Sequence, residues 1–142
     1  MPHKVPNDIL IPEMERLLRA GKQVVFTPDG VSMRPFIEGG KDSVVLEHPA
    51  DIRTGDILLC RVGTSYVLHR LIALSGDNLT LMGDGNIAGV EHCGRQDVLG
   101  RVVEIRSPRG RTKTMRGWRL WLRLLPIRPF LLKIYRHLIF NS

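Results

Sequence analysis

The sequence predicts a mainly β domain, built as a coiled antiparallel or mixed sheet or as a small barrel. Two observations support this fold class. Six short runs rich in β-branched residues and leucine follow one another between residues 23 and 105, and turn-forming residues separate them. No helix-length segment lies between these runs. We therefore expect three parts: an N-terminal helix in residues 1–22, a β-rich domain in residues 23–105 and a basic helical tail in residues 106–142.

The first part should form a short helix that ends near Ala20. Asn7 or Asp8 is suited to cap it, Pro12 fits its first turn, and Gly21 is placed to end it. One helical face is apolar and comprises Ile9, Leu10, Met14, Leu17 and Leu18. Acidic residues follow the single N-terminal lysine closely, so this segment is neither a secretory signal nor a membrane anchor.

The six expected strands are QVVFT, SVVLEH, ILLCRV, SYVLHRLIAL, NLTLM and VLGRVVEI. Turn signals such as PDG, EGGKD, RTGD and VGTS lie between them. Only the three residues SGD separate SYVLHRLIAL from NLTLM, which predicts a β-hairpin.

The tail carries all of the positive excess of the chain. Residues 1–105 contain 11 basic and 14 acidic residues, whereas residues 106–142 contain 10 basic and no acidic residues. Pro126 and Pro129 should divide the tail into two short helices. Its charges exclude a membrane span, and no recognisable motif for reading nucleic acid is present.

Two fates of the tail remain open. Its apolar residues can pack on the β domain, or residues 115–140 can lie on an anionic membrane surface with Trp118 and Trp121 at headgroup depth. The second alternative is slightly favoured, because ten unpaired basic residues exceed what solubility requires. We accordingly expect the protein in the cytoplasm or at the periphery of the cytoplasmic membrane.

Ser32 is the candidate nucleophile. It follows Gly30 in a turn and precedes Pro35, a setting that can expose the hydroxyl and direct the backbone N–H outward. His69, in SYVLHRLIAL, is a candidate general base, because imidazole exchanges protons near neutral pH. Asp84 or Glu91 can supply a carboxylate that orients the imidazole. Taken singly, each of these residues is more simply a turn or core residue.

Taken together, these segments resemble the type I signal peptidase family, within a wider clan that includes LexA-like self-cleaving repressors. The resemblance covers residues 30–103. It consists of Ser32-Met33-Arg34-Pro35, Gly55-Asp56-Ile57, Val67-Leu68-His69-Arg70, Gly83-Asp84-Gly85-Asn86 and Leu99-Gly100-Arg101-Val102. The His-Arg pair is similar to the branch of the endoplasmic reticulum and archaea, which uses His where the bacterial branch uses Lys.

The resemblance implies a serine endopeptidase with the signal peptidase/LexA fold, acting on an extended peptide with small side chains before the scissile bond. It implies Ser32 as nucleophile, His69 as base and an oxyanion site near Gly30, Ser32 and Met33. The family commonly has a serine where this chain has Gly30. In the resembled branch, the acidic residue of the triad follows the Gly-Asp-x-Asn motif by a few residues, and the same spacing in this chain leads to Val90, next to Glu91. Three alternatives therefore remain for the orienting acid: Glu91, Asp84, or no acid, in a Ser–His dyad.

Two other functions are alternatives to the peptidase. The first is a catalytically inactive module that binds peptides or a membrane surface with the same fold. The second is a self-cleaving repressor, which is less favoured because only about 22 residues precede the β domain. Cys60 and Cys93 are expected to be core thiols, since their spacing with His92 does not suit a metal site. The chemistry requires neither a metal nor an organic cofactor.

Overall fold

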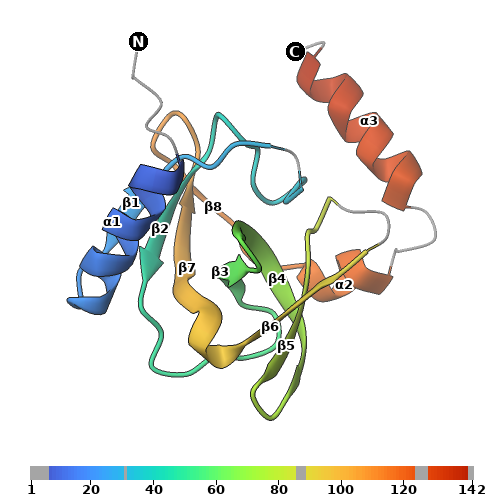
Figure 1. Ribbon diagram of the computed structural model, residues 1–142. Helices are drawn as coiled ribbons and strands as arrows, with labels where there is room; N and C mark the ends of the chain where they lie inside the picture. The colour runs from blue at the N-terminus through green and yellow to red at the C-terminus, as the bar shows by residue number, and fades with distance from the viewer. Residues whose placement is uncertain (1–6, 31, 86–88, 124–127, 141–142) are drawn as a thin grey trace.

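The computed structural model describes residues 7–30, 32–85, 89–123 and 128–140. In this part of the chain, eight strands form one curled antiparallel sheet with the shape of a half-barrel (Figure 1). The strands lie in the order β1-β2-β7-β3-β4-β5-β6, and β8 pairs with β7. The strand β7, which comes late in the sequence, therefore lies between β2 and β3 and joins the two parts of the sheet.

The helices are α1 (Asn7–Arg19), α2 (Trp118–Arg123) and α3 (Arg128–Phe140), with a short 3-10 helix η1 (Arg95–Asp97). The strands are β1 (Val24–Phe26), β2 (Ser43–Glu47), β3 (Ile57–Val62), β4 (Ser65–Ser75), β5 (Asn78–Met82), β6 (Glu91–Gly94), β7 (Val98–Arg106) and β8 (Thr112–Lys113).

All six strands expected from the sequence are confirmed, and so is the hairpin formed by β4 and β5. Every strand pair in the described residues is antiparallel, which decides between the antiparallel and mixed alternatives. The sequence did not predict β6 or β8. Both are short and polar, and both lack the alternating apolar pattern by which strands are recognised.

The central strand β3 is buried on both faces of the sheet. Ile57 and Leu59 enter one apolar core, whereas Leu58 and Cys60 enter the other. Successive side chains of a strand point to opposite faces, so an uninterrupted apolar run is what a strand covered on both sides requires. This strand holds β4, which carries His69, and pairs Leu58 with His69.

The helix α1 covers the first of these cores. Ile11, Met14 and Leu18 are buried against the sheet, and a β-carbon at Gly100 would lie 3.1 Å from Leu18. The helix therefore packs closely on β7. Pro12 was predicted to lie in the first turn of this helix, but it is the sixth residue of α1 and lies beyond that turn. The side chains of residues 7–9, including the proposed caps, lie outside the described set.

The tail is divided between the sheet and two separate helices. β8 lies beyond the predicted boundary at residue 105 and extends the sheet beside β7. The division into α2 and α3 was predicted, although Pro126 itself lies outside the described residues. α2 lies against the body of the domain, whereas most of α3 extends away from the sheet (Figure 1). None of the helices in the described ranges is long and apolar enough to cross a bilayer.

Candidate active site

Ser32 and His69 line the same cavity. The cavity has a volume of about 220 Å³. One wall comes from the segment between β1 and β2, through residues 28–30, 32–33, 37 and 39, and the other comes from residues 66–69 of β4. The fold thus brings together the candidate nucleophile and the candidate base, which are 37 residues apart in the sequence.

The turn that carries Ser32 is held by its backbone and by the side chain that follows. The carbonyl oxygen of Ser32 accepts a hydrogen bond from the N–H of Gly85 at 2.7 Å. Met33 is buried in the first core, and its carbonyl accepts the N–H groups of Phe36 and Ile37. The chain is therefore fixed at Ser32 and directly after it, which suits a candidate nucleophile on a rigid support.

Glu91 is the carboxylate that contacts His69. One of its oxygens lies against Nδ1 of the imidazole. This nitrogen is inaccessible to solvent and has no hydrogen bond of regular geometry in the described structure. His69 is buried and Glu91 is half-buried, so the contact is partly shielded from water.

Asp84 has a different partner. Its two carboxylate oxygens accept hydrogen bonds from Nε and Nη2 of Arg70 at 2.8 and 2.7 Å. Both side chains are about 1% exposed. A carboxylate engaged at both oxygens by a guanidinium is not placed to orient an imidazole. Of the two acids that the sequence offered, the structure brings Glu91 and not Asp84 to His69.

Arg70 organises the side of the domain next to the site, a role that the sequence analysis did not assign. It donates a further hydrogen bond to the carbonyl of Gly55 at 2.7 Å. Its guanidinium also lies 4.9 Å from the ring centre of Phe36 and 5.7 Å from that of Trp118. This role could have been inferred from the sequence, because Arg70 is a charged residue inside the apolar run YVLHRLIAL. A buried arginine needs an acidic partner.

Two glycines shape the wall of the cavity beside Ser32. Gly30 has φ = +89°, a conformation that favours glycine and disfavours serine. A serine at this position would therefore be strained. A β-carbon at Gly39 would lie 1.9 Å from the carbonyl oxygen of Gly30, so the two backbone segments touch directly.

We expect Gly39→Ala to lower the free energy of unfolding by about 3 kcal/mol, because the added carbon collides with backbone atoms that cannot rotate away. Gly40→Ala is the matched control. Gly40 has φ = +76° but open space around its α-carbon. Gly40→Ala should therefore lower the free energy of unfolding by only about 1 kcal/mol. Urea unfolding of both variants measures the difference. Equal losses would contradict the close approach of residues 30 and 39.

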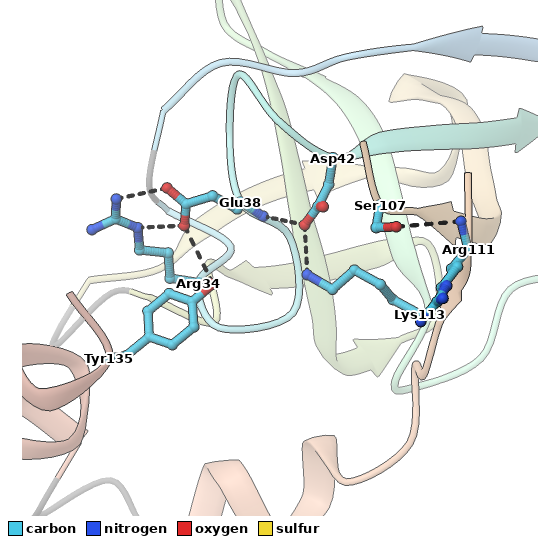
Figure 2. Close-up of polar contacts among 7 residues, drawn as sticks. All are labelled: Arg34, Glu38, Asp42, Ser107, Arg111, Lys113 and Tyr135. Atoms are coloured by element: carbon cyan, nitrogen blue, oxygen red, sulfur yellow. Dashed lines mark hydrogen bonds and ion pairs between the residues drawn. The ribbon is translucent and has the colours of Figure 1, made fainter. Parts of the chain in front are cut away.

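A polar network fixes the rest of the segment that follows Ser32 (Figure 2). Arg34 binds both carboxylate oxygens of Glu38, at 2.8 and 2.7 Å. The N–H of Glu38 donates to Asp42, and the same Asp42 oxygen accepts a hydrogen bond from Lys113 at 2.5 Å. Through Lys113 of β8, the tail is connected to the segment that contains the candidate nucleophile.

The helix α3 reaches this network through Tyr135 (Figure 2). The Tyr135 hydroxyl donates to Glu38 at 3.4 Å, and Arg34 lies 6.0 Å from the ring centre. Partial burial, together with the negative charges of Glu38 and Asp42, raises the pKa of Tyr135 to about 12. The phenol is therefore protonated near neutral pH and able to donate this hydrogen bond.

The remaining candidates lie apart from the cavity. Cys60 is buried in the second core, and Cys93 packs against the same core from β6. Burial raises the pKa of both thiols, so they are protonated at neutral pH. Among the described residues, no group of His, Cys, Asp and Glu side chains is arranged to hold a metal ion. Asn86, the last residue of the Gly-Asp-Gly-Asn motif, lies outside the described residues.

Comparison of the chain with models of known protein families and with curated proteins finds no match. The functional interpretation therefore depends on the residues and the geometry described above.

Proposed function

We propose that the protein is a serine endopeptidase in which Ser32 is the nucleophile, His69 the general base and Glu91 the residue that orients the base. One observation carries this proposal: Ser32 and His69 line one cavity, while the Glu91 carboxylate lies against Nδ1 of the same imidazole. The order of roles is that of a nucleophile, a base and a base-orienting acid.

The reaction follows from these positions. The Ser32 hydroxyl attacks the peptide carbonyl as its proton passes to Nε2 of His69, which forms a tetrahedral oxyanion. Glu91 stabilises the resulting imidazolium through Nδ1. The imidazolium then returns the proton to the leaving amine, and an acyl-enzyme forms on Ser32. Water, activated by the same imidazole, hydrolyses this ester and regenerates the serine.

The backbone around Ser32 is the proposed oxyanion site. The N–H of Ser32 is the expected donor, with Gly30 and Met33 as neighbours in the cavity wall. Gly30 has no hydroxyl, so backbone donors would carry this stabilisation. The resemblance to type I signal peptidases supports an extended peptide as substrate, with small side chains before the scissile bond. Among the described strands, residues 66–69 of β4 pair with β3 alone, so their other side is open to such a strand-like peptide.

The test is covalent labelling of the full chain by a fluorophosphonate, followed by intact mass measurement and peptide mapping. We expect one adduct, on Ser32. Ser32→Ala should abolish the adduct, and His69→Ala should slow its formation by at least about 100-fold, the usual contribution of a general base. Ser65→Ala, an exposed serine in the β3–β4 hairpin, is the matched control and should label as the wild type does.

Absence of an adduct on Ser32 in a folded sample would contradict the proposal. It would favour the alternative of a catalytically inactive module that binds a peptide in the same cavity. An adduct on another serine that survives Ser32→Ala would show that the nucleophile has been assigned to the wrong residue.

A further inference from the structure

The helix α3 exposes a row of large apolar side chains. Phe130 and Leu138 are 65% and 63% exposed, and Ile134 between them is also exposed. The spacing of four residues places all three on one face of the helix. Exposed apolar residues that are scattered singly need no explanation, but a continuous row on one helix marks a surface that contacts another apolar phase.

Another side of the helix contacts the domain. Leu132 and Tyr135 are half-buried, and the Tyr135 hydroxyl donates a hydrogen bond to Glu38 of the domain. The exposed row is therefore not the face that attaches α3 to the protein. The row is exposed at each of its three positions, from Phe130 to Leu138, on a helix most of which extends away from the sheet (Figure 1).

Basic side chains are exposed outside the apolar row. Lys133 and Arg136 are exposed on α3, and Arg119 and Arg123 are exposed on α2. The whole region from residue 106 to residue 142 contains ten basic residues and no acidic residue. A helix with an apolar row on one face and lysine and arginine on its other faces has the composition of one that lies in a membrane interface.

We propose that α3 binds the surface of an anionic lipid bilayer, with Phe130, Ile134 and Leu138 in the acyl boundary and the basic residues on lipid headgroups. Charge complementarity selects this occupant. A second copy of the tail would bring ten further positive charges against the first. A nucleic acid would neutralise the charges but would leave the apolar row in water. Anionic lipid satisfies both features at once.

Vesicle flotation with the full chain tests the proposal directly. We expect the protein to float with vesicles of phosphatidylcholine and phosphatidylglycerol, and to stay in the soluble fraction with phosphatidylcholine alone. Raising the salt concentration to about 0.5 M should weaken the binding, because salt screens exposed charges. The assay does not depend on peptidase activity.

Paired variants separate the apolar row from apolar surface in general. Phe130→Ser with Leu138→Ser should weaken binding to anionic vesicles about tenfold or more, because it removes the side chains that enter the acyl boundary. Val25→Ser with Val90→Ser also removes two exposed apolar side chains, from elsewhere in the domain, and should bind as the wild type does. Circular dichroism checks that both proteins are folded.

Three results would overturn the proposal. The first is a wild-type chain that stays soluble with anionic vesicles at low salt. The second is equal binding by the two paired variants. The third is a chain that shifts a short RNA in a gel but ignores vesicles, which would assign the basic surface to nucleic acid.

Discussion

Glu91→Gln is expected to lower kcat on a peptide substrate by about 10⁴-fold while the fold persists. In the structure, a Glu91 oxygen faces Nδ1 of His69. A carboxylate at this position only accepts, so it holds the proton on Nδ1 and leaves Nε2 free to take the proton of Ser32. An amide can instead donate to Nδ1. The imidazole would then carry its proton on Nε2, where it cannot act as a base toward Ser32.

Steady-state kinetics of the purified variant measures the effect, and reaction with a fluorophosphonate provides a readout without a known substrate. Glu104→Gln is the matched control: a carboxylate in β7 whose hydrogen bonds go to Arg106 and Thr112, not to His69. It should retain activity near that of the wild type. A loss of less than about tenfold in Glu91→Gln, or roughly 1.4 kcal/mol, would favour a Ser–His dyad.

The sequence predicted the sheet well because most of its strands are apolar runs that turn-forming residues separate. In β3, four consecutive buried residues, from Ile57 to Cys60, produce a pattern that a strand covered on both faces requires. β6 has no such pattern, because Glu91 and His92 begin a strand whose residues are only partly buried or exposed. Its position depends on pairing with β5, a long-range contact that local sequence does not encode.

The assignment of the acid shows the same limit at the candidate site. Asp84 and Glu91 are seven residues apart, and sequence spacing alone could not decide between them. The decisive fact is the place of Arg70, which is fully buried and binds both oxygens of Asp84. A buried guanidinium without an acid is costly, so the arginine in an apolar strand could have pointed to Asp84 as its partner.

Of the two fates expected for the tail, the structure shows packing on the domain for part of the tail, and binding to a membrane surface stays a prediction. Trp118 lies over Arg70, and the Trp121 indole donates to the carbonyl of Asp84, so these tryptophans contact the body of the domain. The structure thus places both tryptophans on the domain, and their expected position at headgroup depth stays a prediction. α3 retains the exposed row ending at Leu138. Alternation of apolar and basic residues indicated an amphipathic tail, but which helix meets the domain depends on tertiary contacts.

Asp84→Asn is expected to lower the free energy of unfolding by about 3 kcal/mol or more, because it leaves the charge of Arg70 buried without a counter-ion. Arg70 and Asp84 are each about 1% exposed, so water cannot replace the lost carboxylate. The hydrogen bond to Gly55 and the aromatic ring of Phe36 still contact the guanidinium, but neither carries negative charge. Urea unfolding followed by circular dichroism measures the loss.

Asp77→Asn is the matched control, because this carboxylate is 87% exposed and lies 3.5 Å from Arg95. Exposed ion pairs contribute little, so its unfolding midpoint should match that of the wild type. Arg70→Met combined with Asp84→Leu removes both charges and should recover part of the stability lost in Asp84→Asn, as replacement of a buried pair by apolar residues often does. Two results would contradict a stabilising role of the buried pair. One is an Asp84→Asn variant as stable as the wild type. The other is a double variant that is less stable than Asp84→Asn by about as much as Asp84→Asn is less stable than the wild type.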